Sequence, residues 1–241
     1  DYKPFYGLGA YHGIGLQMVN DDIGIFSHKK FSAVYALKQK LAGGVLSIGV
    51  QPTMLTEGLN ASKVDLNESG DETFGSSDVN GSAFDLNVGL YYKRKNWYAG
   101  VSVQHVTAPT VEIGDRSELA LSQSYYLMAG CNIRLRNPFL TIQPSVMGRY
   151  DGVAYRADVT ARATYTYEKR VMYAGLGYSP TNSFTVYLGG MFHGIMLGYS
   201  YEVYTSAVPV GNGSHELFVG YQTDVNLFKK GRNHHQSVRL L

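Results

Sequence analysis

The sequence predicts an all-β protein, and more narrowly a transmembrane antiparallel up-and-down β-barrel with about 12 strands. Apolar and polar residues alternate with a period of two along most of the chain, as a pleated strand requires and a helix cannot provide. Glycine (28 residues) and tyrosine (20 residues) are abundant, whereas charged residues make up only 17% of the 241-residue chain. No apolar run reaches the roughly 18 residues of a membrane helix. This composition suits many strands with small residues on one side and phenols near membrane interfaces.

The clearest element is a hairpin over residues 82–107. Its first strand places Phe84, Leu86 and Leu90 on one face, opposite Asp85, Asn87 and Gly89 on the other. A solvated sheet surface would carry lysine and glutamate in place of glycine and asparagine. The hairpin therefore fits a wall between lipid and a polar lumen.

The same alternation predicts the remaining strands and the connections between them. Outside the hairpin the expected strands are 5–19, 31–40, 46–54, 125–135, 140–146, 155–167, 172–178, 184–188, 195–203 and 217–225. Residues 20–24 are expected to form a turn, and residues 57–81 and 108–121 to form loops. Pro52 cannot donate to a ladder, so it predicts a strand end, a bulge or an edge.

The composition, cysteine count and net charge limit the domain organisation and the chemistry that the chain can have. Residues 1–228 are expected to form the barrel and residues 229–241 a basic periplasmic tail, because composition changes nowhere else. A single Cys131 excludes an intramolecular disulfide, and a net charge of +2 is too small to indicate nucleic-acid binding. The glycines at 7–9 lie inside an alternating strand, so they predict no nucleotide loop. We expect no cofactor, metal site or catalytic residue.

Five ionisable residues fall on the predicted inner face. They are expected to line the lumen and to pair with one another: Asp85, Arg156, Asp158, Arg162 and Glu202.

Every second connection is short and basic, while those between are longer and more acidic. Up-and-down connectivity brings the basic connections to one end of the barrel, the periplasmic end by the usual asymmetry of loop lengths. The expected partner-binding residues there and in the tail are Lys93, Arg94, Lys95, Lys169, Arg170, Lys229, Lys230, Arg232 and Arg239. The alternative is that these charges keep the barrel end hydrated or contact anionic lipid head groups.

Several stretches taken together resemble the PorP/SprF family of type IX secretion system outer-membrane proteins. The stretches are 7–24, with its Asn-Asp-Asp-Ile-Gly segment, 32–36, 46–50, 84–92, 97–102 and the end Ser-Val-Arg-Leu-Leu at 237–241. Members of that family begin with an Asn-Pro-Ala-Tyr-Ala-Gly-like motif and at least one further hairpin, which this sequence lacks. With that hairpin, the barrel would have about 14 strands.

The resemblance implies a non-enzymatic, multi-pass component of the outer membrane in the secretion and gliding machinery. Such a component would link secreted or surface-anchored substrate proteins to the periplasmic lipoprotein and ring components of the motor. Two other hypotheses remain open, namely a transport channel for a small solute and an outer-membrane hydrolase. Bilayer conductance and turnover of phospholipid or peptide substrates would distinguish them.

Overall fold

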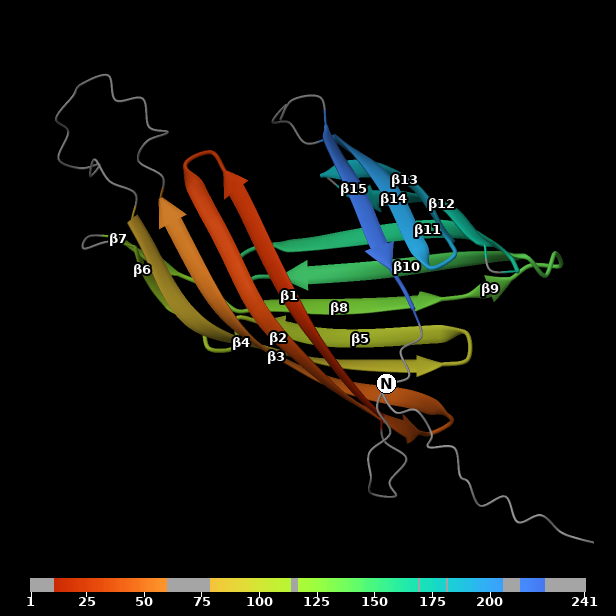
Figure 1. Ribbon diagram of the computed structural model, residues 1–241, viewed down its shortest axis with the longest axis horizontal. Helices are drawn as coiled ribbons and strands as arrows, with labels where there is room; N and C mark the ends of the chain where they lie inside the picture. Colours follow the sequence, from red (N-terminus) through yellow and green to blue (C-terminus); the bar gives the residue numbers. More distant parts are fainter. Residues whose placement is uncertain are drawn as a thin grey trace, which may run out of the picture.

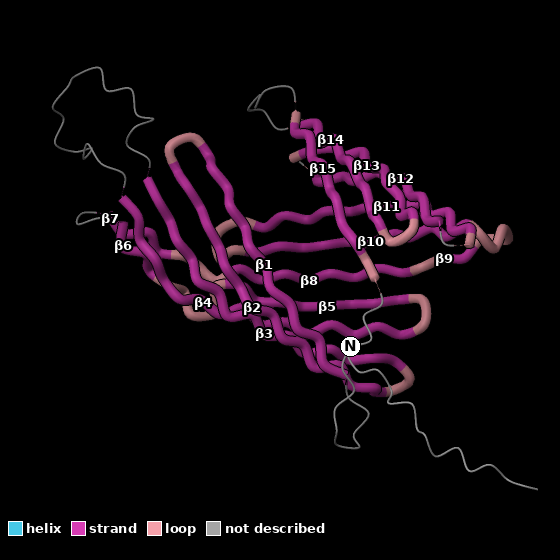
Figure 2. Tube along the Cα trace, viewed as in Figure 1, coloured by secondary structure: helices cyan, strands magenta, loops and turns pink. Residues whose placement is uncertain are grey.

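The computed structural model describes residues 11–59, 79–113, 117–168, 170–180, 182–205 and 213–223. The strands in these ranges are β1 Tyr11–Ile23, β2 Phe26–Leu41, β3 Gly44–Leu59, β4 Val79–Arg94, β5 Trp97–Gln104, β6 Thr110–Ile113, β7 Ser117–Ala120, β8 Ser124–Cys131, β9 Ile133–Arg134, β10 Leu140–Tyr150, β11 Tyr155–Tyr167, β12 Arg170–Ser179, β13 Ser183–Phe192, β14 Ile195–Tyr204 and β15 Ser214–Tyr221. Figure 2 shows strands joined mostly by short loops. In this part of the chain no helix is long and apolar enough to cross a membrane.

One antiparallel sheet contains almost all of these strands. Its order is β1-β2-β3-β4-β5-β8-β10-β11-β12-β13-β14-β15. The short β9 pairs with β10 along the same edge as β8, and β6 and β7 form a separate hairpin. Neighbours in the sheet are therefore neighbours in sequence, apart from the small strands between β5 and β10. The prediction of an all-β, antiparallel, up-and-down fold with about 12 strands is confirmed.

The sheet curls, so that both edge strands, β1 and β15, lie in front of the central strands (Figure 1). The strand pairs in the described residues do not include β1 with β15, so this part of the sheet is not closed. Side chains at both edges are correspondingly open, with Ile14 89% and Leu217 77% exposed, compared with 41% for Val186 inside the sheet.

Register gives the sheet two chemically different faces. On the outer face, cross-strand partners are apolar, as in Val146 opposite Val159 and Leu188 opposite Tyr199. On the inner face they are polar or small, as in Thr53 opposite Asp85. The outer side chains are extensively exposed, and an apolar surface of this extent is typical of a membrane or protein interface.

Two prolines lie within interior strands, and the expectation that Pro52 marks a strand end, a bulge or an edge is wrong. The β3–β4 pairing runs without a break through Pro52 opposite Leu86. On the other side, the β2–β3 pairing stops at Ser32 opposite Thr53 and resumes in the same register at Tyr35 opposite Val50. The missing N–H therefore interrupts one ladder without inserting a residue. Pro144 lies at the corresponding break between β8 and β9.

The expected loop over 108–121 contains a hairpin instead. β6 and β7 pair with each other, and β6 packs on the inner face of β3 and β4. Val111 and Leu55 are completely buried there, and the backbone of Glu112 lies directly on Gly81. A small apolar core thus forms inside the curl of the sheet.

The turn expected at 20–24 and the start of the loop expected at 57–81 are also strand. β1 continues to Ile23, so the reversal is confined to the two residues before β2, where Gly24 has a φ of +63°. β3 continues to Leu59. The strands are longer than the apolar pattern because ladder hydrogen bonds continue beyond the last apolar side chain.

A substitution at Gly81 tests the contact between the β6–β7 hairpin and the inner face of the sheet. A Cβ at Gly81 would overlap the Glu112 carbonyl, whereas a Cβ at Gly49, also on the inner face, would meet atoms no closer than 3.9 Å. We expect G81A to lift the hairpin and speed amide hydrogen exchange over 110–113 about ten-fold, because local opening then costs less. G49A is the matched control. Equal exchange in the two variants would contradict the direct backbone contact.

Neighbouring positions on β11 test the assignment of the faces. Val159 lies on the outer face, and Thr160 lies on the inner face opposite Ser145. We expect V159R to reduce folding into bilayers far more than T160R, because a cation at mid-bilayer on the lipid side costs about 2–4 kcal/mol. Folding yield and urea stability in liposomes measure the difference. Equal damage from both substitutions would contradict the assignment.

Candidate functional site

An ion cluster joins three of the residues expected to line the lumen. The Arg156 Nε donates to Asp158 Oδ1 at 3.0 Å on the same strand, and Arg156 Nη2 lies 3.7 Å from Glu202 Oε1 on β14. The Ser183 hydroxyl on β13 also donates to Glu202. One guanidinium thus connects carboxylates of two strands that are not neighbours in the sheet.

Arg162, the third basic or acidic residue of β11, makes different contacts. Its Nε donates to Gln143 Oε1 at 2.7 Å, and its guanidinium lies over the Tyr173 ring at 5.5 Å from the ring centroid. The same Gln143 oxygen accepts from Thr164 at 2.9 Å. The expected pairing with the other ions is therefore replaced by an amide and an aromatic ring.

Asp85 is fully buried and lies apart from the Arg156 cluster. Its Oδ2 is 2.9 Å from His105 Nδ1, and its Oδ1 accepts from the Thr107 hydroxyl at 3.0 Å. Asn87, next on the inner face, accepts from the His105 backbone N–H at 2.9 Å. The segment that follows β5 is thereby fixed against β4. The sequence pattern did not identify these partners, because the alternation ends at Gln104, where β5 also ends, and the last three residues of the expected hairpin are not strand.

A second histidine–carboxylate pair lies near the β6–β7 hairpin. His28 on β2 contacts Glu57 on β3, and the two are partners in register. Glu57 is buried, although the sequence pattern placed it in an exposed loop. No group of three or more metal-binding side chains occurs among the described residues.

The expected basic end has four described members, all exposed at connections on the same end of the sheet. Lys93, Arg94 and Lys95 surround the β4–β5 turn, and Arg170 begins β12. The β2–β3 turn lies at this end too (Figure 1), and the Arg94 guanidinium reaches over it, since a Cβ on Gly43 would lie 3.7 Å from Arg94 Nε.

Other cations lie at the same end. They are Lys38 and Lys40 on β2, together with Arg134 and Arg136 between β8 and β10. Lys38 and Lys40 were not among the expected binding residues, although their two-residue spacing on one face was a signal. Lys169, Lys229, Lys230, Arg232 and Arg239 lie outside the described residues.

The fold and its two-faced sheet agree with a comparison against protein families. The model of the type IX secretion system membrane protein PorP/SprF family matches residues 5–221 of the chain. The chain belongs to the PorP/SprF family. No curated protein matches it. The family assignment makes this chain a membrane component of the type IX secretion system and confirms the resemblance seen in the sequence.

Asp85 offers a test of the inner polar network in this PorP/SprF protein. D85N keeps the shape of the side chain but turns an NH₂ group toward one of the two donors. We expect it to lower the free energy of unfolding by about 1–3 kcal/mol, the cost of a buried polar group that loses its partner. Urea unfolding in detergent micelles measures this change.

The control is D21N, which removes the same charge at an exposed site on β1. A surface substitution of this kind is expected to change stability by less than about 0.5 kcal/mol. If both variants unfold at the same urea concentration, Asp85 does not hold the segment after β5.

Proposed function

We propose that the chain is a non-enzymatic β-barrel of the outer membrane that connects secreted or surface-anchored substrates to the periplasmic motor and ring complex of the type IX system. In this proposal the outer face of the sheet contacts lipid. The basic end lies in the periplasm and docks an acidic partner, one of the lipoprotein or ring components.

The observation that carries the proposal is the convergence of exposed cations from separate connections at one end of the sheet. The β4–β5 turn, the start of β12 and the end of β2 each contribute. Charges from connections far apart in sequence add their fields when the fold brings them together, and such a field steers an acidic partner.

The outer face supports the membrane location. Its exposed side chains are leucine, valine, isoleucine and methionine along the strands, with aromatic residues such as Trp97, Tyr150 and Tyr167 near the strand ends. This distribution is typical of barrels, in which aromatic girdles lie at both membrane interfaces.

Binding of the purified periplasmic ring lipoprotein to the barrel in detergent tests the docking. Each exposed ion pair contributes at most about 1 kcal/mol, so K93Q/K95Q is expected to weaken binding about five-fold at physiological salt. Raising salt to about 1 M shortens the screening length from about 8 to about 3 Å and should remove most of the affinity.

The matched control is K29Q/K30Q, which removes two positive charges from β2 near the β1–β2 turn, at the opposite end. It is expected to bind the lipoprotein as tightly as the unchanged protein. If the control weakens binding as much as K93Q/K95Q, net charge and not the basic end governs the interaction. Deletion of 231–241 with neutralised Lys229 and Lys230 extends the same test to the tail.

A further inference from the structure

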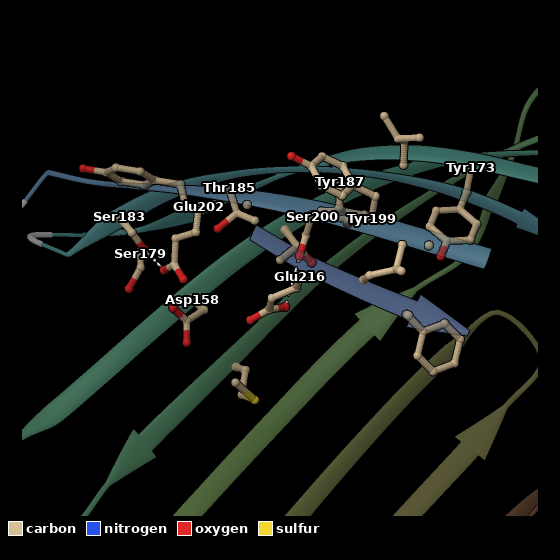
Figure 3. Close-up of a pocket in the computed structure, with 18 of the residues that line it drawn as sticks. Asp158, Tyr173, Ser179, Ser183, Thr185, Tyr187, Tyr199, Ser200, Glu202 and Glu216 are labelled. Atoms are coloured by element: carbon tan, nitrogen blue, oxygen red, sulfur yellow. Dashed lines mark hydrogen bonds between the residues drawn. The ribbon is translucent and has the colours of Figure 1, made fainter. Parts of the chain in front are cut away.

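The inner face of β11–β15 contains a cavity of about 800 Å³ whose lining the docking proposal does not use. Its polar walls come from the Arg156 cluster, from Ser200 and from Glu216, and its aromatic walls from Tyr173, Tyr187 and Phe218. Figure 3 shows the carboxylates and hydroxyls at one part of the cavity and Tyr173 at another. We propose that this cavity binds an organic cation, an ammonium or guanidinium group carried on an apolar or hydroxyl-bearing chain.

The charged residues that line the cavity indicate the sign of the ligand's charge. Three carboxylates, of Asp158, Glu202 and Glu216, face a single guanidinium, that of Arg156. Arg156 is already shared between Asp158 and Glu202. The guanidinium of Arg162 lies over the Tyr173 ring of the lining, and with its charge counted the carboxylates still outnumber the guanidinium groups by three to two. The cavity therefore has an excess of negative charge.

Glu216 is the carboxylate available to a ligand. Its Oε2 accepts from the Ser200 hydroxyl at 3.0 Å, and none of the ion pairs among the described residues includes it. The hydroxyl orients the carboxylate without neutralising it. Glu216 is exposed on the edge strand, so a cation can reach its carboxylate from solvent and form a charge-assisted hydrogen bond there.

Aromatic rings lie where the rest of a cation would extend. Tyr187, Ser200 and Glu216 occupy one cross-strand row of β13, β14 and β15. Phe218 is the next inner residue of β15, about 7 Å from Glu216 along the strand. A cation at the Glu216 carboxylate is thus within reach of a ring face, where the ring quadrupole attracts it.

Glycines open this aromatic part of the cavity. In the row of Phe218, both Gly189 and Gly198 lie beneath the Tyr173 hydroxyl group, with no side chain of their own. The Tyr187 ring likewise lies against Gly175. The two tyrosine rings thus lie along the wall of the cavity, with their planes tilted by 53° to each other. Aromatic rings beside a carboxylate that forms no ion pair are the features that recognise organic cations.

Calorimetric titration of the purified protein in neutral detergent tests the proposal with three probes. Spermidine represents a free polyamine, acetyl-arginine amide represents a basic side chain of a peptide, and maltotriose is a neutral, hydroxyl-rich control. We expect at least one cation to bind with an affinity that falls as salt rises, and maltotriose to show no binding. Spermidine alone would identify a free polyamine as the ligand class, and acetyl-arginine amide alone a basic side chain. Binding of maltotriose as tight as that of the cations, or no binding of either cation at millimolar concentration, would overturn the proposal.

Two substitutions locate the binding within the cavity. E216Q keeps the size of the side chain and is expected to weaken binding about ten-fold, while E168Q removes the same charge from the β11–β12 turn at the other end and should have no effect. F218L keeps apolar bulk without a ring face and is expected to weaken binding about three-fold. Equal affinities of E216Q and E168Q would place the cation elsewhere. These results are independent of lipoprotein docking, which K93Q/K95Q is expected to weaken and E216Q to leave unchanged.

Discussion

The cross-strand register is the constraint on which the rest of this structure depends. Because side chains alternate between faces along every strand, one register decides all the neighbours of both faces at once. Here the chosen register aligns apolar partners outside, such as Ala161 with Leu176, and places Arg162 opposite Gly175 inside. A slip of one residue between any two strands would exchange these faces. Both the apolar outer face and the inner polar network therefore follow from the same set of backbone hydrogen bonds.

The abundance of glycine and tyrosine has a common cause inside the sheet. Tyr98 lies against Gly130, and Tyr187 against Gly175, each ring occupying the space that a side chain on the neighbouring strand would need. A large ring can then lie along the wall instead of filling the interior. This packing leaves room for the cavity beside β15 and explains why the inner face is neither filled with apolar side chains nor covered by charged ones.

Much of this arrangement is visible in the sequence, because a period of two is a local signal. The strand order, the two faces and the shared end of Lys93 and Arg170 follow once the strands and connections are recognised. The pairing of Asp85 with His105 does not follow from the strand pattern. It depends on the backbone conformation just after β5, where His105 has a φ of +55°. The β6–β7 hairpin escaped prediction because four-residue strands such as Thr110–Ile113 are too short to show a period. The continuation of β3 through Pro52 is not visible in the sequence, because the missing N–H interrupts one ladder only and the residue type does not show which ladder.

The central claim is that the basic turns lie in the periplasm while the opposite end faces the outside of the cell. Cysteine labelling in living cells tests it directly, in a background that carries C131S. Asn96 lies in the β4–β5 turn of the basic end, and Val153, 94% exposed, lies in the β10–β11 turn of the opposite end. A membrane-impermeant maleimide should label V153C in intact cells and N96C only after the outer membrane is permeabilised. Labelling of N96C in intact cells, with V153C protected, would contradict the account.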